Sequence, residues 1–445
     1  MTVSGVFDAT TDPALRSWVP VPAECDFPVQ NLSLGIVSRA GESPRVGVAI
    51  GADVLDLALV AEAGLLEESL PGSRVVLSGA SLNALLGRGR SAWTALRARL
   101  SRLLAVDDQT LRDVPGLVER ALYPRTQARM RLPFAVGDYV DFYSSIEHAT
   151  NLGRLFRPGA EPLLPNYRHI PIGYHGRSST IVVSGTPIVR PCGQRRPDPQ
   201  RGPVFGASAA LDIELEIGFV TGPGNALGTP ISIAAAREHI YGLVLVNDWS
   251  ARDIQAWEYQ PLGPFLGKSF ATSISPWVVS LAALEPYRVA GPVQEPEPLP
   301  YLRTAEAWNY DIALSVELQS AQMARAGTAP LTISRPNFKK MYWNMAQQLA
   351  HATVNGAVTR PGDLFASGTI SDVEPDFGSL IELTWRGAHP IRLPDGSQRA
   401  FLQDGDSVRL LGHAGGGAAP RIGFGEVSGS VSAADLGTTS TEVNP

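Results

Sequence analysis

Short apolar runs, separated by glycine and proline, dominate the larger second part of this 445-residue sequence. Between about 133 and 436 the runs read TIVVSG, LDIELEIGFV, YGLVLVNDW, PWVVSL, DIALSVEL, LIELTW and SVRLLG. Runs of this length, rich in β-branched residues and bounded by turn formers, are typical of strands. They predict a mixed, mostly antiparallel β architecture, and they are far too short to span a bilayer as helices.

One clear helix is expected within this β-rich part. It would begin at Asn337, a good N-cap, and stop by Gly356. The residues expected to face inward are Phe338, Met341, Tyr342, Met345 and Leu349. We expect this helix to cover one face of the sheet. The stretches 189–206 and 284–302, dense in proline and glycine, are typical of long surface loops.

The first part of the chain has a different pattern. From Gly35 to Leu57, short apolar runs broken by Gly, Pro and Asp predict strands joined by tight turns. Between Ala92 and about Arg129, apolar residues recur at helical spacing and predict amphipathic helices packed on that β unit. The residues that carry this spacing are Trp93, Leu96, Leu100, Leu103 and Leu104.

A chain of this length is expected to form two domains, because single cores tend to split above about 250 to 300 residues. We place the boundary near Leu132 and Pro133, which predicts domains over 17–132 and 133–436. Residues 1 to about 20 are polar and lack periodicity, so we expect a loosely held extension there.

Charge and cysteine content exclude several classes of function. The formal net charge is -6 and no basic run occurs, which argues against nucleic acid or an anionic membrane as the main partner. The two cysteines, Cys25 and Cys192, show neither CxxC nor Cys/His spacing, so no disulfide framework or zinc site is indicated. We expect a cytoplasmic protein that acts on a small molecule.

The run LDIELEIGFV carries two carboxylates on one face. A strand alternates faces, so Glu214 and Glu216 project together, opposite Ile213, Leu215 and Ile217. Their repulsion is costly unless a cation lies between them, and ligation by carboxylates alone suits hard ions such as Mg²⁺, Ca²⁺ or Mn²⁺. The alternative is the solvated polar face of an edge strand.

The segment VNDWSARDIQAWEYQPLGPFLGKSF places several polar residues directly after an apolar strand: Asp248, Arg252, Gln255, Tyr259 and Lys268. Asp248 is a candidate third metal ligand. Arg252, Gln255 and Lys268 could donate hydrogen bonds to a developing oxyanion. The alternative for Arg252 is a surface ion pair with Asp253 or Glu258. Lysine is rare in this chain, so Lys268 suggests that a compact ammonium was required.

The stretch GDYVDFYSSIEHATNLGRLFR supplies further polar candidates: Asp138, Asp141, Tyr143, His148, Arg154 and Arg157. His148 could act as a general base near neutral pH, although a lone histidine is more often an ordinary core or surface residue. Two glycine-containing loops, one with Tyr174 and His175 and one with Gly368 and Thr369, are typical of segments that let a ligand approach the backbone. Ordinary turns are the alternative for both.

Five ordered blocks together closely resemble the fumarylacetoacetase (fumarylacetoacetate hydrolase) family. They read DFYSSIEHATN, LPNYRHIPIGYHGRSSTIVVSGTPI, LDIELEIGFVTGPGN, VNDWSARDIQAWEYQPLGPFLGKSFATSISPWVV and RPGDLFASGTIS, and the resemblance runs from about Val21 to Gly429. It implies a mostly β fold with some α: a small SH3-like β-barrel N-terminal domain and a larger mixed β-roll catalytic domain. It also implies a homodimer.

The resemblance assigns a role to each candidate residue. A divalent cation, Ca²⁺ or Mg²⁺, would be held by Asp141, Glu214, Glu216 and Asp248, and Lys268 beside Thr272 would help to bind and balance the metal site. The catalytic set would comprise His148 as the base that activates water, Glu382 in SLIELTW as its orienting partner, and Arg252, Gln255 and Lys268 as oxyanion donors. The residues implied in substrate binding are Tyr143, Arg157, Tyr174, Gln255, Tyr259, Gly368 and Thr369. Arg157 suits a carboxylate end of the substrate.

The reaction implied by the resemblance is hydrolysis of a carbon–carbon bond in 4-fumarylacetoacetate, the last step of tyrosine and phenylalanine breakdown. The products would be fumarate and acetoacetate. Ile146 stands where the family usually has a basic residue, so substrate preference is less well defined than reaction type. Two alternatives stay open: an acylpyruvate hydrolase or 2-oxo acid decarboxylase of the wider superfamily, and a non-catalytic ligand-binding protein.

Overall fold

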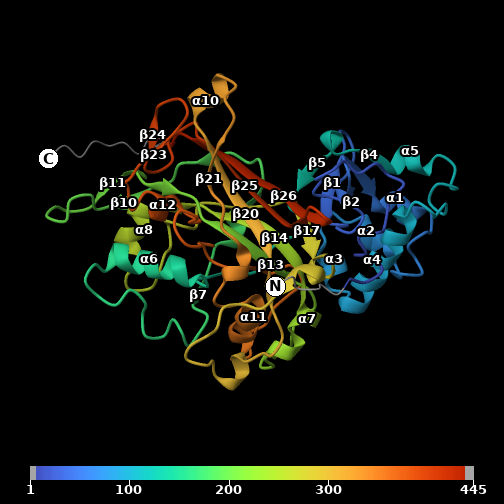
Figure 1. Ribbon diagram of the computed structural model, residues 1–445, viewed down its shortest axis with the longest axis horizontal. Coiled ribbons are helices and arrows are strands. Elements are labelled where there is room, and N and C mark those ends of the chain that lie inside the picture. Colours follow the sequence, from blue (N-terminus) through green and yellow to red (C-terminus); the bar gives the residue numbers. More distant parts are fainter. Residues whose placement is uncertain (1–6, 436–445) are drawn as a thin grey trace.

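The computed structural model describes residues 7–435, and the chain is mostly β, with two main sheets (Figure 1). The larger sheet runs through both parts of the chain in the order β4-β3-β2-β1-β17-β14-β13-β22-β6-β7. The two parts join where β1 pairs antiparallel with β17, at Leu34 and Val278. The strands of this sheet are β1 (Leu34–Ser38), β2 (Arg45–Ile50), β3 (Asp53–Asp56), β4 (Leu122–Pro124), β5 (Arg129–Arg131), β6 (Tyr139–Phe142), β7 (Gly173–His175), β8 (Ile181–Val183), β13 (Leu215–Thr221), β14 (Ile240–Asp248), β16 (Thr272–Ile274), β17 (Trp277–Ser280) and β22 (Leu364–Ala366).

The second sheet has the order β21-β20-β25-β26-β9 and encloses the larger apolar core with the first sheet. Residues alternate between buried and more exposed along β20 and β25, because successive side chains of a strand point to opposite faces. Its strands are β9 (Ile188–Val189), β20 (Ile312–Gln319), β21 (Leu331–Ser334), β25 (Ser407–Gly416) and β26 (Ala419–Ser432). Four two-stranded ladders complete the β structure: β10 (Cys192–Arg195) with β11 (Val204–Ala207), β12 (Leu211–Asp212) with β15 (Ser250–Ala251), β18 (Arg288–Val289) with β19 (Asn309–Tyr310), and β23 (Ile391–Arg392) with β24 (Gln398–Arg399).

The helices of the N-terminal part lie together on one side of the molecule (Figure 1). They are α1 (Leu57–Glu62), α2 (Ser73–Leu77), α3 (Asn83–Leu86), α4 (Arg90–Leu104) and α5 (Leu117–Ala121). The helices of the second part are α6 (Ile146–Phe156), α7 (Ala236–His239), α8 (Arg252–Glu258), α9 (Leu281–Leu284), α10 (Ala321–Arg325), α11 (Met345–Thr353) and α12 (Leu380–Leu383). No helix within residues 7–435 is long and apolar enough to cross a bilayer.

The strand and helix predictions for the N-terminal part are confirmed. The strands β1 to β3 cover the Gly35–Leu57 region, and all five apolar residues predicted to pack are buried on α4. The second apolar core joins these helices to Val244 and Val246 of β14, so it extends across the expected boundary. The boundary at 132/133 and the SH3-like barrel closure stay predictions, and residue 436 lies outside the described residues.

The helix predicted from Asn337 begins later than expected. The Asn337 side chain accepts a hydrogen bond from Lys339 N and caps only the 3-10 turn over Phe338–Lys340. The helix α11 starts after Asn344, which forms a reciprocal capping box with Gln347. The five residues predicted to face inward are nevertheless buried.

The run LIELTW is not a strand, because Leu380–Leu383 forms the short helix α12. Both carboxylate oxygens of the buried Asp212 accept hydrogen bonds from the first backbone amides of this helix, Leu380 N (2.7 Å) and Ile381 N (3.0 Å). A carboxylate at a helix N-terminus satisfies amides that have no partner within the helix, which favours the helical turn over an extended chain.

The expected loose N-terminal extension is wrong for the part that the structure describes. Arg97 donates to Thr10 Oγ1 at 2.8 Å, and Trp18 Nε1 donates to Leu103 O at 2.9 Å. These contacts hold the segment against α4. Residues 1–6 of the expected extension lie outside the described residues.

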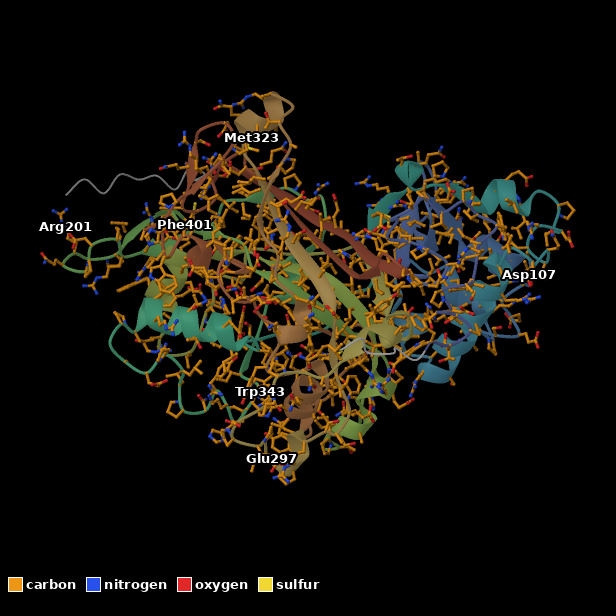
Figure 2. All side chains as sticks on the ribbon, in the orientation of Figure 1. Asp107, Arg201, Glu297, Met323, Trp343 and Phe401 are labelled. Carbon is orange, nitrogen blue, oxygen red and sulfur yellow. The ribbon has the colours of Figure 1, made fainter. Side chains whose placement is uncertain are left out.

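The stretch 189–206 is more regular than the expected loop, because it contains most of the β10–β11 hairpin. Figure 2 shows Arg201 in this hairpin at the opposite end of the molecule from Asp107. Of the stretch 284–302, residues 290–299 contain neither helix nor strand, as expected for a loop.

Candidate active site

Four buried carboxylates meet at the ends of neighbouring strands of the large sheet. Asp141 lies on β6, Glu216 on β13 and Asp248 at the end of β14, and Glu214 directly precedes β13. Each offers an oxygen, and these oxygens all lie within 4.8 Å of one another. One oxygen each of Asp141 and Glu216 is buried without a hydrogen-bond partner. An all-oxygen set with unpartnered atoms fits a hard divalent cation.

The electrostatics of this cluster differ from one carboxylate to the next. Burial, together with the neighbouring carboxylates, raises the pKa of Asp141 and of Glu216 well above the ordinary values. Burial also acts to raise the pKa of Glu214, but Lys268 and Arg252 outweigh it and lower that pKa to about 2. The raised pKa values favour the protonated forms of Asp141 and Glu216 in the protein alone, and a bound divalent cation would favour their ionised forms.

Three side chains surround Asp248. Lys268 Nζ donates to Asp248 Oδ2 at 2.8 Å and also pairs with Glu214. Thr272 Oγ1 donates to Asp248 Oδ1 at 2.8 Å, and Tyr174 OH donates to Asp248 Oδ2 at 3.0 Å. Lys268 is buried, and although burial alone would lower its pKa, Asp248 and Glu214 outweigh it and raise the pKa of the ammonium. Lys268 thus compensates charge inside the cluster.

Arg252 is buried at the start of α8 and does not form the surface pairs considered for it. Its Nε donates to Asp212 Oδ2 at 2.8 Å, and its Nη1 lies 2.7 Å from Glu214 Oε1 and donates to Gln255 Oε1 at 3.2 Å. Arg252 Nη2 is buried without a partner. Asp253 instead accepts from Ser208 Oγ.

Sequence reasoning missed Asp212. Its carboxylate joins Arg252 to the first amides of α12, the helix that carries Glu382. The signal was present, because Asp212 precedes Glu214 and Glu216 with the same alternation in LDIELE.

His148 and Glu382 form a buried pair. His148 Nδ1 lies 2.6 Å from Glu382 Oε2, and α6 is capped just before His148 by Ser145, whose Oγ accepts from His148 N. A carboxylate on Nδ1 holds the ring proton there, which leaves Nε2 as the acceptor. The Tyr143 ring packs edge-on against the His148 ring at 5.4 Å between centroids.

Three further side chains that sequence reasoning missed hold Glu382. Ser371 Oγ (2.9 Å) and Ser379 Oγ (2.7 Å) donate to Oε2, and Asn151 Nδ2 donates to Oε1 at 3.0 Å. Burial acts to raise the pKa of Glu382, but His148 and these donors outweigh it and lower the pKa. No short motif joins Asn151, Ser371 and Ser379, so only the folded chain identifies them.

One cavity of about 420 Å³ brings most of the predicted residues together. Its polar lining includes Asp141, Tyr143, His148, Arg157, Tyr174, Glu214, Arg252, Gln255, Tyr259, Lys268, Gly368 and Thr369. The remaining predicted residues do not line the cavity. Glu216, Asp248 and Glu382 each hydrogen-bond to a lining residue, and Thr272 hydrogen-bonds to Asp248. The size and the mixture of apolar walls with convergent polar groups are typical of a small-molecule site.

Several lining groups have no partner within the protein. Thr369 Oγ1 and Arg157 Nε are buried without hydrogen bonds. Gly368 has φ +77°, and a Cβ there would lie 2.1 Å from Phe142 O, so only glycine lets this loop approach the cavity floor. These groups can therefore bind a ligand without first breaking a bond inside the protein.

Other polar candidates lie elsewhere. Ile146 and Arg154 line a separate pocket on the other side of α6, and His175 lines a third pocket. Asp138 pairs with Arg360. Ile146 is thus no part of the cavity wall around His148.

Family models match nearly the whole described chain. The model "Fumarylacetoacetase N-terminal" matches residues 30–133, and the model "Fumarylacetoacetate (FAA) hydrolase C-terminal" matches residues 139–432. The chain belongs to the fumarylacetoacetase family. Among its relatives, the fumarylacetoacetase of Rattus norvegicus is 51% identical over 93% of this chain and 98% of that protein. The fumarylacetoacetase of Bos taurus is 52% identical over the same shares.

A solved structure supports the fold. A putative HpcE protein from Mycobacterium smegmatis aligns with a TM-score of 0.50 and 19% identity over 90% of this chain and 99% of that one. The predicted fold class, mostly β with the N- and C-terminal units of the fumarylacetoacetase family, is confirmed. The protein is a hydrolase that acts on a small molecule. Its buried acidic cluster is suited to a divalent metal.

Proposed function

We propose that this enzyme hydrolyses the carbon–carbon bond of 4-fumarylacetoacetate in the cavity lined by His148 and by Asp141 and Glu214 of the four-carboxylate cluster. The observation that carries the proposal is that His148, which pairs with Glu382, lines the same cavity as Asp141 and Glu214 of the buried acidic cluster. The names of the relatives support the substrate, because proteins about half identical over almost the full length are fumarylacetoacetases.

His148 acts as the general base. Since Glu382 accepts at Nδ1, His148 Nε2 is free to take a proton from water, and the water oxygen then attacks a carbonyl carbon of the substrate. The Glu382 carboxylate stabilises the imidazolium that forms. The same proton can return to the departing carbon, which completes formation of acetoacetate.

Arg252, Gln255 and Lys268 are the oxyanion donors, and they line the same cavity as His148. Arg252 Nη2 is buried and unpartnered, so it can donate to an oxyanion at no cost in existing bonds. Lys268 and Gln255 line the same cavity and add donors. One such donor typically contributes about 10² to 10³ in rate.

The metal site would be formed by Asp141, Glu214, Glu216 and Asp248, with Lys268 and Thr272 beside them. A bound Ca²⁺ or Mg²⁺ would act as a Lewis acid and stabilise the negative charge that develops when the carbon leaving group departs as an enolate. Arg157 is suited to a terminal carboxylate, and its unpartnered Nε supports that role. Tyr143, Tyr174, Tyr259, Gly368 and Thr369 complete the substrate-binding set.

We further propose a homodimer, a cytoplasmic location and the domain division 17–132 and 133–436. Exposed apolar side chains beside the cavity support the dimer: Trp257, Leu262, Phe265 and Leu266, of which Leu262 is 96% exposed. Sedimentation of the Leu262→Asp variant tests the dimer, since a charge in an apolar interface should dissociate it.

The free thiols of Cys25 and Cys192 support a reducing compartment, in agreement with a cytoplasmic location.

The experiment that tests the function follows the loss of 4-fumarylacetoacetate absorbance. The enzyme is first freed of metal with a chelator, and Ca²⁺ or Mg²⁺ is then restored. Turnover that appears only with the ion is expected, and the more active ion identifies the preferred cofactor. If the metal-replete enzyme leaves 4-fumarylacetoacetate intact but cleaves an acylpyruvate, the substrate assignment is wrong.

A further inference from the structure

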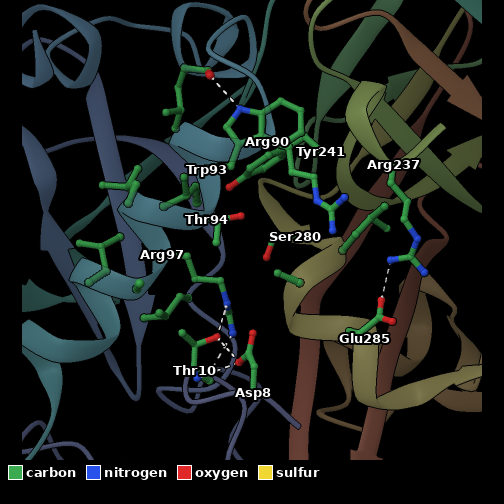
Figure 3. A pocket seen from close by; sticks show the side chains of 18 of the residues that line it. Asp8, Thr10, Arg90, Trp93, Thr94, Arg97, Arg237, Tyr241, Ser280 and Glu285 are labelled. Atoms are coloured by element: carbon green, nitrogen blue, oxygen red, sulfur yellow. Dashed lines mark hydrogen bonds and ion pairs between the residues drawn. The ribbon is translucent and has the colours of Figure 1, made fainter. Parts of the chain in front are cut away.

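A cavity between α4 and residues 280–285 has its buried polar groups bonded within the protein (Figure 3). It measures about 450 Å³. Arg97 donates to Thr10 Oγ1 at 2.8 Å, and Arg237 pairs with Glu285 at 3.0 Å. In the part of the chain that the structure describes, none of the buried or half-buried residues of its lining has a buried side-chain nitrogen or oxygen without a partner. This lining therefore contains no buried group that needs a ligand.

The Tyr139 hydroxyl, by contrast, is buried with no hydrogen-bond partner within residues 7–435. The residue is only 3% exposed. One oxygen each of Asp141 and Glu216 is in the same condition. A buried hydroxyl without a partner is costly, so its presence needs a physical reason.

The fold places Tyr139 on the side of β6 that carries Asp141. Residues two apart on a strand share a face, and both of these side chains are buried, whereas Val140 between them packs against the larger core. The Tyr139 ring lies in the second core. A Cβ on Gly176 would lie 2.3 Å from this ring, so glycine at that position leaves room for it.

The charges that act on the Tyr139 hydroxyl come from the acidic cluster. Burial, followed by three members of the cluster, raises the pKa of Tyr139 well above its ordinary value: Asp248, Asp141 and Glu216. Thr272 acts in the opposite direction, but its hydroxyl donates to Asp248 Oδ1 at 2.8 Å and forms no hydrogen bond with Tyr139. The phenol is therefore a protonated donor beside the cluster that is bonded to none of its carboxylates.

We propose that Tyr139 is a positioning residue of the metal site. Its hydroxyl donates to an oxygen of the acidic cluster when the cluster holds a divalent cation, and it thereby fixes the orientation of a carboxylate ligand. Carboxylates that bind a metal are usually hydrogen-bonded themselves, and such partners typically contribute about ten- to hundred-fold in affinity. The proposal rests on the proposed metal site, to which it adds a residue that is not a ligand.

Calorimetric titration of the metal-free enzyme with Ca²⁺ and with Mg²⁺ measures this contribution. Tyr139→Phe removes only the hydroxyl, and it should weaken binding of the preferred ion about ten-fold. Tyr310→Phe is the matched control, because the Tyr310 hydroxyl is also buried without a partner in the described part of the chain. The charges that act on Tyr310 come from other residues: Glu285, Arg237 and Glu306. The control should therefore keep the wild-type metal affinity.

Melting temperatures separate this role from a purely structural one. Without metal, Tyr139→Phe should melt no lower than the wild type, because the change removes a buried hydroxyl that has no partner. With metal, the rise in melting temperature should be smaller in the variant, since weaker binding gives less stabilisation at the same ion concentration. A lower melting temperature without metal, together with wild-type metal affinity, would overturn the proposal.

The same titrations distinguish failure of this proposal from failure of the metal site. If the wild type binds neither ion, the metal site and the role of Tyr139 are both wrong. If Glu216→Gln loses affinity while Tyr139→Phe keeps it, only the role of Tyr139 is wrong. Equal losses in Tyr139→Phe and Tyr310→Phe would also overturn the proposal, because the effect would then not depend on a position beside the cluster.

Discussion

The two sides of the catalytic cavity differ in how completely they are hydrogen-bonded. On the histidine side, Glu382 accepts from His148, Asn151, Ser371 and Ser379, and its pKa is lowered. On the acidic side, buried oxygens of Asp141 and Glu216 have no partner, and the pKa of each residue is raised. The Glu382 carboxylate thus has its hydrogen-bond partners in the protein alone. The unpartnered oxygens of Asp141 and Glu216 would gain a partner only when a cation binds.

This difference implies that the histidine side is positioned by the protein alone, whereas the acidic side depends on a bound cation. A fully satisfied carboxylate fixes the position and tautomer of its histidine before any ligand arrives. In a cluster with unpartnered carboxylate oxygens, desolvation and repulsion stay uncompensated until a cation binds. Relief of these unfavourable terms then contributes to the free energy of metal binding. Variants on the histidine side should therefore change turnover without changing metal binding, and variants on the acidic side should change metal binding first.

The largest expected effect is on the histidine side. His148→Ala should lower kcat by about 10² to 10⁴, because the general base is lost. Metal content, measured by elemental analysis, should stay the same as in the wild type, because His148 is no member of the acidic cluster. Near-normal kcat would remove His148 from the mechanism, and loss of metal would break the separation between the two sides.

The next effect is on the acidic side. Glu216→Gln should weaken Ca²⁺ or Mg²⁺ binding by at least the ten- to hundred-fold that supporting residues of metal sites typically contribute. Calorimetric titration of the metal-free variant measures it. Glu382→Gln is the matched control, since it makes the same chemical change on the other side and should leave metal affinity unchanged. Equal metal affinity for wild type and Glu216→Gln would contradict the assignment of the cluster.

Local sequence pattern predicted the strands and the paired carboxylates, because both depend on an alternation that the chain itself carries. The same alternation extends to Asp212, which was missed because its partners, Arg252 and the α12 amides, are 40 and about 168 residues away. These long-range bonds also turn LIELTW into a helix. Likewise, Asn337 and Asn344 were both possible N-caps for α11, but only Asn344 has a glutamine, Gln347, at the spacing of a capping box.

The position of Asp212 between the two sides leads to the third prediction. Asp212→Asn should lower kcat about ten-fold, because Arg252 and the helix that carries Glu382 lose their shared anchor, and small misplacements of catalytic groups are costly. Metal affinity and KM should change little. The pH profile of kcat should shift if the Glu382–His148 pair moves with α12. If the variant has a lower melting temperature but its folded fraction keeps the wild-type kcat, Asp212 has only a structural role.

The smallest expected effect, and the one that compares the two sides most directly, is the pH dependence of stability in the metal-free protein. The lowered pKa of Glu382 contributes stability above its ordinary value of 4.5, and this contribution is lost as the pH falls through the lowered pKa. The raised pKa values of Asp141 and Glu216 act in the opposite direction, so their contribution is present at low pH and is lost as the pH rises through them.

Urea unfolding in the presence of a chelator, repeated across the acidic and neutral range, separates these contributions. The wild type should exceed Glu382→Gln in free energy of unfolding at neutral pH, and the gap should close in acid. Glu216→Gln should gain on the wild type as the pH rises. Each unit of pKa shift corresponds to about 1.4 kcal/mol. If both variants change with pH in the same direction, the two carboxylate environments are alike and the contrast between the two sides fails.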